Sequence, residues 1–356
     1  MSVSPMRIRS RLGNYTVESG SLESIAHSFD LERDFLLVDG FVVDHYGPRV
    51  LGSLPSDRCV VIRALERNKT LQYASKIIET IMLMGITKRT RIISVGGGIV
   101  QDLSGFVASI LYRGLEWHFY PSTLLAQTDS CIGAKTSINF LSFKNLVGTF
   151  YNPTKVIRVP GFLETLSRRE FFSGMGEIIK LHIIGGRELT AELLQLAGDL
   201  ERREGKATER VISNSLRVKK RFIEEDEFDK GIRNLLNYGH CIGHAIEAST
   251  KYGIPHGQAV TLGMLLANRI AVSRGELSRN KAELLEKDLF RPFVEARNWK
   301  KTLPADSILE AMRRDKKRVG KKLVVIYLND DDEILKREDV DDEEVRIQLA
   351  SWNGRT

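Results

Sequence analysis

The chain of 356 residues is long enough for two domains, each with its own hydrophobic core. Its formal net charge of +7 comes from lysines and arginines spread along the chain, so the composition argues against a nucleic-acid-binding protein and allows a basic pocket for an anionic metabolite. The three cysteines form no CxxC pair, and no segment resembles a secretory signal or a membrane span, so we expect a cytoplasmic protein.

The first part of the chain alternates short strands with helices. Apolar runs that end in polar or turn residues predict strands at 36–40, 59–64, 91–98 and 116–123. Apolar residues at helical spacing predict helices over 71–86 and 101–114. This alternation indicates a parallel sheet with helices on its faces, and we assign it to a domain over residues 1–160.

From about Pro160 the pattern becomes mostly helical. The helical segments are 161–184, 189–204, 210–227, 239–250, 258–275 and 306–317. An apolar run at 322–328 predicts one late strand, which we expect VRIQLA at 345–350 to pair with, and the acidic stretch 338–344 predicts a solvated turn. Residues 161–356 therefore predict a second, mostly helical domain, with a cleft between it and the first.

A glycine-rich turn, GGGIVQD at 96–102, follows one predicted strand and precedes a helix. Glycines there let the backbone approach a pyrophosphate while the helix presents free N–H groups, but the same motif also occurs as a plain strand-to-helix turn. Asp39 ends an earlier strand, where an acid commonly accepts hydrogen bonds from a ribose. An ordinary turn aspartate is the alternative for this residue.

Three of the seven histidines, His240, His244 and His256, lie within seventeen consecutive positions. His240 and His244 share one face of a helix, and His256 follows a Gly-Ile-Pro break. With an oxygen from Glu177 on another helix, two of these imidazoles would leave an open position on Zn²⁺, which is the catalytic pattern. A histidine pair at this spacing is also common on ordinary helices, and a histidine that is not a ligand is available for proton transfer or phosphate contact.

Basic residues gather in otherwise apolar or glycine-rich surroundings. They are Lys135, Lys144, Lys180, Lys219 and Arg233. Because they lie beside turn residues or next to candidate ligands, they predict a pocket for a substrate with more than one negative charge.

Several motifs occur together and in one order. They are GGGIVQDLSGFVAS, LYRG, YPSTLLAQTDSCIGAKTSIN, KNLVGTFYNPTKV, FLETL, GEIIK, DEFDKGIRNLLNYGHCIGHAIE and HGQAVTLGM, and they span most of residues 36–275. On these motifs the chain resembles the 3-dehydroquinate synthases, within the sugar phosphate cyclases. The resemblance implies an α/β, Rossmann-like NAD-binding domain over 1–160, a mostly α-helical metal- and substrate-binding domain over 161–356, and a homodimer.

The resemblance also implies roles for individual residues. A divalent metal, Zn or Co, would be bound by Glu177, His240 and His256, which leaves His244 near the substrate phosphate. The residues implied at NAD are Asp39, Glu66, Lys69, Gly97, Gly98, Asp102, Ser122, Thr123, Leu125, Lys144 and Thr165. Those implied at the substrate are Asp129, Lys135, Asn145, Lys180, Lys219, Arg233, Asn237, His244 and Lys316, together with Arg113, which would reach the phosphate site of a neighbouring subunit.

The activity that the resemblance implies is cyclisation of 3-deoxy-D-arabino-heptulosonate 7-phosphate with elimination of phosphate. In this chemistry NAD⁺ oxidises an alcohol and later returns the hydride, while the metal polarises the substrate oxygen. The partner that it implies is thus a small sugar phosphate, with neither nucleic acid nor membrane.

The chain departs from the family pattern at several positions. Asp229 stands where a glutamate is usual, and Ala134 and Gln101 stand where glycines are usual. These departures leave open a paralogous cyclase of the amino-dehydroquinate, 2-deoxy-scyllo-inosose or valiolone type. Arg233 and its basic neighbours favour a carboxylate-bearing substrate, because a neutral sugar would leave buried cations unpaired.

Two other classes of function compete with the cyclase. A metal-dependent alcohol or glycerol phosphate dehydrogenase would accumulate NADH, whereas the cyclase would release phosphate without doing so. A basic nucleic-acid-binding or regulatory protein would bind with a steep salt dependence, and the scattered charge argues against it.

Overall fold

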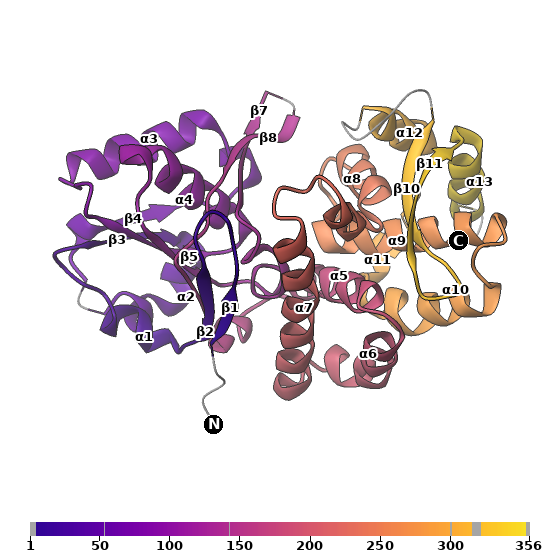
Figure 1. Ribbon diagram of the computed structural model, residues 1–356, viewed down its shortest axis with the longest axis horizontal. Coiled ribbons are helices and arrows are strands. Elements are labelled where there is room, and N and C mark those ends of the chain that lie inside the picture. Colours follow the sequence, from indigo (N-terminus) through magenta and orange to yellow (C-terminus); the bar gives the residue numbers. More distant parts are fainter. Residues whose placement is uncertain (1–4, 53, 142, 300, 315–321, 354–356) are drawn as a thin grey trace. The chain divides into compact units, whose positions relative to one another are not determined.

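The computed structural model describes residues 5–52, 54–141, 143–299, 301–314 and 322–353. The chain divides into two units, Met1–Leu166 and Ser167–Thr356. Figure 1 shows a sheet flanked by helices in the first unit, coloured indigo to magenta, and mostly helices in the second, which ends in yellow. The predicted fold class, a parallel-sheet Rossmann-like domain followed by a helical one, is confirmed.

A seven-stranded sheet forms the centre of the first unit, with strand order β1-β2-β9-β6-β5-β3-β4. Strands β1 and β2 run antiparallel, and the remaining neighbours run parallel. The strands are β1 (Met6–Ile8), β2 (Tyr15–Ser19), β3 (Asp34–Asp39), β4 (Cys59–Ile62), β5 (Arg91–Gly96), β6 (Trp117–Pro121) and β9 (Lys155–Arg158). Strands β3, β4, β5 and β6 confirm the four predicted from the sequence.

Helices cover the sheet, and a separate hairpin follows β6. The helices are α1 (Leu22–His27), α2 (Gly40–Val50), α3 (Leu71–Leu83) and α4 (Gly98–Ile110), and the antiparallel hairpin is β7 (Lys135–Phe140) with β8 (Phe143–Phe150). Both predicted helices are confirmed. The second begins at Gly98 instead of 101, because the turn after β5 leads directly into its first turn.

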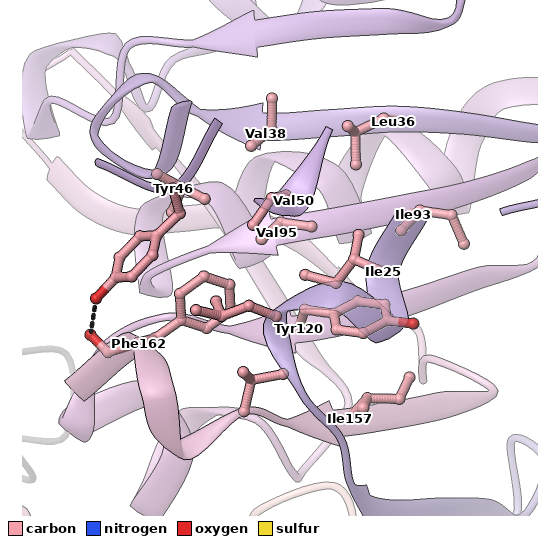
Figure 2. Packing of buried hydrophobic residues seen from close by; sticks show 13 residues of the cluster. Ile25, Leu36, Val38, Tyr46, Val50, Ile93, Val95, Tyr120, Ile157 and Phe162 are labelled. Atoms are coloured by element: carbon pink, nitrogen blue, oxygen red, sulfur yellow. Dashed lines mark hydrogen bonds between the residues drawn. The ribbon is translucent and has the colours of Figure 1, made fainter. Parts of the chain in front are cut away.

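Apolar side chains from β3, β5 and β6 pack against α1 and α2, as Figure 2 shows. Every residue of β3 before Asp39 is buried, as expected for a strand covered on both faces. On the helical side of this core, the hydroxyl of Tyr46 donates to Thr165 Oγ1 at 2.8 Å and to the carbonyl of Gly161 at 3.0 Å. The segment that follows β9 is thereby tied to α2.

The order of the strands places a topological switch point between β3 and β5. From β3 the chain passes to β4 on one side, and from β5 it passes to β6 on the other. In open parallel sheets, ligands bind outside the carboxyl ends of the strands at such a point. Asp39 is the last residue of β3, and Gly97 directly follows β5.

Helices form most of the second unit. They are α5 (Arg168–Ile184), α6 (Arg187–Glu201), α7 (Gly205–Glu225), α8 (His240–Ser249), α9 (His256–Ser273), α10 (Arg279–Leu285), α11 (Ala296–Trp299), α12 (Ala305–Arg313) and α13 (Asp342–Asn353). One antiparallel hairpin, β10 (Leu323–Leu328) with β11 (Ile334–Val340), lies beside them in Figure 1. Strand β10 confirms the late strand predicted at 322–328.

The predicted partner of β10 was wrong. Residues 345–350 lie in α13, and β10 pairs with β11. Val345 and Leu349 are buried whereas Ile347 is 54% exposed, so the apolar spacing is that of a helix and not that of an alternating strand. The stretch 338–344 is likewise more than a turn, since it ends β11 and begins α13, where three acidic residues suit the positive end of the helix.

Helix α9 crosses α5 at a contact that only glycine permits. A Cβ at Gly257 would lie 1.7 Å from the carbonyl oxygen of Ser173, and one at Gly176 would lie 2.0 Å from the carbonyl oxygen of Gly257. Gly176 directly precedes Glu177, and Gly257 directly follows His256. The crossing therefore brings these two side chains to the same place.

Helix α9 also packs closely against α8. A Cβ at Gly263 would lie 2.1 Å from the carbonyl oxygen of Gly239, which adopts a φ of 75° at the start of α8. Gly239 directly precedes His240. The second close contact thus brings His240 toward the α5–α9 crossing.

Replacing Gly257 with alanine should separate α5 from α9. Because the new methyl group would meet backbone and not a flexible side chain, we expect the Gly257→Ala variant to lose at least about 2 kcal/mol of unfolding free energy. Gly198→Ala on α6 is the control, since that position is open and alanine should stabilise the helix by up to about 1 kcal/mol. Urea unfolding of both variants measures the difference, and equal stabilities would contradict a glycine-dependent crossing.

Candidate active site

The turn after β5 leaves open space beside the start of α4. Gly97 is the N-cap residue, and a Cβ there would lie 2.9 Å from the side chain of Thr123. At Gly98 a Cβ would lie 3.9 Å from Ser130 Oγ, its nearest described neighbour, so internal packing does not demand a glycine. Space next to the first N–H groups of a helix, which have no carbonyl partner within the helix, is suited to a phosphate group.

A buried lysine joins α4 to the β7–β8 hairpin. Lys69 Nζ lies 2.5 Å from Asp102 Oδ2 and donates to Asn145 Oδ1 at 2.6 Å. Asp102 Oδ1 also accepts from the backbone N–H of Ser137 at 2.9 Å. Burial raises the pKa of Asp102, and the ammonium of Lys69 only partly opposes this shift. Three residues predicted at the site thus form one network.

The network continues into the loop before α3. Asn139 Nδ2 donates to Glu66 Oε1 at 2.8 Å, and Asn139 Oδ1 accepts from the backbone N–H of Asn145 at 3.0 Å. Lys144 Nζ lies 3.5 Å from Glu66 Oε1. Glu66 and Lys144 are far apart in the sequence and are both predicted at NAD, and the structure brings them together.

The remaining residues predicted at NAD lie at the end of β3 or after β6 and β9. They are Asp39, Ser122, Thr123, Leu125 and Thr165. The carboxylate of Asp39 caps α2 by accepting from the N–H of Phe41 at 3.1 Å, and burial raises its pKa. Thr165 is held by Tyr46. Their roles toward a nucleotide remain predictions.

Three further residues of the first unit are predicted at the substrate. Asp129 is half-buried in the π-helical turn η4 (Ala126–Ser130), and Lys135 is exposed at the start of β7. Arg113 is exposed at the end of a short turn with a φ of 66°. Its predicted contact with a neighbouring subunit remains a prediction.

In the second unit, Glu177 meets the two imidazoles that the helix crossings bring to it. Glu177 Oε1 lies 3.2 Å from His256 Nε2 and 3.4 Å from His240 Nε2. Both carboxylate oxygens of Glu177 are buried. Donor atoms around a tetrahedral Zn²⁺ with bonds of about 2.0–2.1 Å are separated by about 3.3 Å, so this arrangement fits a metal ion.

The three histidines also cluster, which leaves two possible donor sets. Suitable ring nitrogens of His240, His244 and His256 all lie within 4.8 Å of one another. His244 is exposed, whereas Glu177 is almost completely buried and its Oε1 lies 3.2 Å and 3.4 Å from the other two imidazoles. Burial and these short distances therefore favour Glu177 as the third donor.

Electrostatics at this cluster favours an ionised carboxylate. Burial alone would raise the pKa of Glu177, but the ammonium of Lys180, 2.5 Å from Oε2, and the imidazole of His240 hold it well below its usual range. Burial lowers the pKa of His240. For His256, burial is outweighed by Glu247 and Glu177, which raise the pKa to about 10.

Known proteins are similar to this chain in sequence and in fold. Residues 59–173 match the family model for the N-terminal part of 3-dehydroquinate synthase, and residues 174–318 match that for its C-terminal part. A 3-dehydroquinate synthase from Streptococcus pneumoniae (strain JJA) is 40% identical over 270 residues, which cover 74% of each chain. The chain belongs to the 3-dehydroquinate synthase family. It is accordingly an enzyme, a carbon–oxygen lyase of the phosphate-eliminating cyclase type.

Two solved cyclases share the fold of this 3-dehydroquinate synthase family member. The 2-epi-5-epi-valiolone synthase from Streptomyces hygroscopicus subsp. jinggangensis, with NAD⁺ and Zn²⁺ bound, superposes with a TM-score of 0.84 at 24% identity and covers 100% of both chains. A 2-deoxy-scyllo-inosose synthase complexed with carbaglucose-6-phosphate, NAD⁺ and Co²⁺ gives 0.81 at 23% identity, over 98% of this chain and 100% of its own. In the part of the chain that the structure describes, every helix is too short or too polar to cross a membrane.

The basic residues of the family's predicted substrate pocket are buried in the second unit. Lys219 on α7 and Arg233 on the 3-10 turn η6 (Ile232–Asn237) are 7% and 5% exposed, so both charges are withdrawn from solvent. Arg233 Nη1 donates to the carbonyl of Glu227, and Asn237 Nδ2 donates to the carbonyl of Asn234 at 2.8 Å. Lys316 lies outside the described residues.

Two departures from the family pattern share an unusual backbone conformation. Asp229 and Ala134 adopt φ values of 58° and 62°, in the left-handed region. Aspartate tolerates this region better than glutamate, which gives a local reason for Asp229. The third departure, Gln101, exchanges two hydrogen bonds of 2.6 Å with Ser130, so a side chain that the family usually lacks braces the turn beside Asp129.

Sequence reasoning missed three residues of these networks. Ser137 and Asn139 follow Lys135 at steps of two along β7. Residues at this spacing lie on the same face of a strand, and this alternation could have identified them. Glu247 lies on α8 one turn beyond His244, and it contacts His256 Nδ1 at 2.9 Å.

The Lys69→Met variant should reveal how much Lys69 stabilises Asp102. Without the ammonium the pKa of Asp102, already raised, should rise further, so the folded variant holds a proton that the unfolded chain releases above pH 4. We expect the variant to lose about 2 kcal/mol of unfolding free energy at pH 7 and less as the pH falls toward 4.

Lys155→Met is the control, since Lys155 is exposed and 3.8 Å from Glu18. Urea unfolding at pH 7 and pH 5 measures both variants. A Lys69→Met deficit that stays constant with pH, or that equals the deficit of the control, would contradict the pairing.

Proposed function

We propose that this enzyme is a 3-dehydroquinate synthase that cyclises 3-deoxy-D-arabino-heptulosonate 7-phosphate with release of phosphate, using NAD and one divalent metal ion. The observation that carries the proposal is the convergence of Glu177, His240 and His256 at metal-donor distances in a chain 40% identical to a 3-dehydroquinate synthase. The NAD⁺ and the Zn²⁺ or Co²⁺ in the two cyclases of the same fold support the same cofactors here.

The metal site would lie in the second unit. Glu177, His240 and His256 would hold the ion, which when bound supplies Lewis-acid polarisation of a substrate oxygen. Lys180 neutralises the second oxygen of Glu177 and keeps the carboxylate ionised. This leaves His244, exposed and on the same face of α8 as His240, available to contact the substrate phosphate or carry a proton.

The nucleotide would use the first unit. NAD supplies an acceptor and later a donor of hydride. The N–H groups at the start of α4 would bind its pyrophosphate, and Asp39, across the switch point, would accept from a ribose hydroxyl. The network around Lys69 holds the β7–β8 hairpin against α4 and so orders one wall of this site.

The substrate carries a carboxylate and a phosphate. Buried Arg233 and Lys219 provide positive charge of the kind that binds a carboxylate. Asp229 and Ala134 depart from the family pattern, so the second candidate function is that of a paralogous cyclase with a different sugar phosphate as substrate. We further propose a homodimer in which Arg113 reaches the phosphate site of the neighbouring subunit.

Phosphate release is the direct test of this function. The enzyme should release phosphate from 3-deoxy-D-arabino-heptulosonate 7-phosphate faster than from sedoheptulose 7-phosphate or glucose 6-phosphate, without accumulation of NADH. Preference for one of the other two sugars would favour the paralogous cyclase, and steady NADH production would favour a dehydrogenase.

His240→Ala should abolish metal binding and activity together while the protein stays folded. His244→Ala is the matched control on the same helix, and it should retain the metal because Glu177 is the third donor. Metal content measured by atomic emission after gel filtration distinguishes the two. Full metal content in His240→Ala, or loss of metal in His244→Ala, would contradict the proposed donor set.

Arg233→Ala should raise the KM for the carboxylate substrate on the order of a hundredfold, given about 1.5–3 kcal/mol for a charged hydrogen bond. Arg221→Ala on the exposed side of α7 is the control and should leave KM unchanged. Steady-state kinetics, with thermal unfolding as a check on the fold, measures the effect. An unchanged KM in Arg233→Ala would remove the carboxylate assignment.

A further inference from the structure

We propose that Glu247 is a positioning residue, which holds the imidazole of His256 so that its Nε2 faces the metal. The inference rests on the metal site proposed above and adds a group that does not itself bind the ion. Glu247 lies on α8, the helix that carries His240, whereas His256 begins α9. One helix would then supply both a ligand and the support of a second ligand.

The contact fixes which nitrogen of the ring is available. His256 Nδ1 lies 2.9 Å from Glu247 Oε2, within hydrogen-bond distance, and its Nε2 lies 3.2 Å from Glu177 Oε1. When a metal displaces the proton of Nε2, an N–H on Nδ1 that donates to a carboxylate presents the Nε2 lone pair, which is the form that binds the metal. The same contact sets the rotation of the ring.

His256 needs external support because of its place in the helix. It is the first residue of α9 and follows Pro255, so no preceding turn of its own helix packs against its side chain. The side chain is 33% exposed, whereas that of Glu247 is 10% exposed. A buried partner on the neighbouring helix therefore restrains the ring from its Nδ1 side.

The other imidazole is supported more weakly. His240 Nδ1 lies 3.3 Å from the backbone carbonyl of Tyr238, which is a longer contact to a neutral acceptor. Both rings turn Nδ1 to a protein oxygen and Nε2 to Glu177, as expected of metal-binding histidines with their outer partners. A carboxylate is the stronger acceptor, and it also increases the basicity of the ligand nitrogen. Glu247 therefore stabilises the more exposed of the two ligands.

Two variants test the role of Glu247. Glu247→Gln keeps an oxygen that can accept from Nδ1 but loses the charge, and Glu247→Ala loses both. We expect Co²⁺ affinity, measured by competition with a chromogenic chelator, to fall about tenfold in the first and about a hundredfold in the second. The visible absorption of bound Co²⁺ should shift in Glu247→Ala, because the ring is no longer held in one orientation.

Glu286→Gln is the matched control. Glu286 is a carboxylate of the second unit with a similarly low side-chain exposure of 13%, and it pairs with Arg269 at 3.0 Å and Arg291 at 2.8 Å. This variant should lower the thermal midpoint of the metal-free protein without changing Co²⁺ affinity. If the role of Glu247 were purely structural, the Glu247 variants would also have a lower thermal midpoint and an unchanged Co²⁺ affinity.

The outcomes separate this inference from the function on which it rests. Weakened Co²⁺ binding by folded Glu247 variants, with unchanged binding by Glu286→Gln, would support it. Wild-type affinity in Glu247→Ala would overturn the positioning role and leave the metal site intact. Failure of the natural protein to bind Co²⁺ would overturn both.

Discussion

The second unit depends on how closely α9 can approach α5 and α8. At both crossings the backbones are so close that a Cβ would collide with a carbonyl oxygen, at 1.7 Å for Gly257 and 2.1 Å for Gly263. Contacts between backbones leave no rotamer to adjust, so they fix the helices more tightly than side-chain packing does. The residues next to these glycine contacts are Glu177, His240 and His256, which gives the stability of the helix bundle and the geometry of the metal site a common origin.

Each unit also contains a buried lysine held against a carboxylate. Lys180 meets Glu177 in the second unit, and Lys69 meets Asp102 in the first. Buried ion pairs stabilise a fold little relative to apolar packing, and removing one partner costs several kcal/mol, so they are retained mainly where charge is needed. Under the proposed function, fixed charges at both places would orient an anionic substrate and a dinucleotide without large rearrangement on binding.

The spacing of apolar residues predicted the helices and strands whose pattern of burial is unambiguous. Strand β3 is apolar along its length because both faces are covered, and α3 shows a plain helical spacing. The VRIQLA segment failed because six residues with apolar side chains at every second position suit a strand as well as a short helix, and tertiary burial of Val345 and Leu349 decided between them.

Spacing alone did not identify the candidate site. Two histidines four residues apart are compatible with any helix. Their convergence with Glu177 depends on glycine contacts between helices that are distant in the chain, and the resemblance to a known family supplied what spacing could not.

X-ray absorption at the metal edge of the Co²⁺-loaded protein tests the central claim most directly. The account predicts two imidazoles and one carboxylate oxygen at about 2.0–2.2 Å, unchanged in His244→Ala. Three imidazoles, or a shell of oxygens alone, would contradict it.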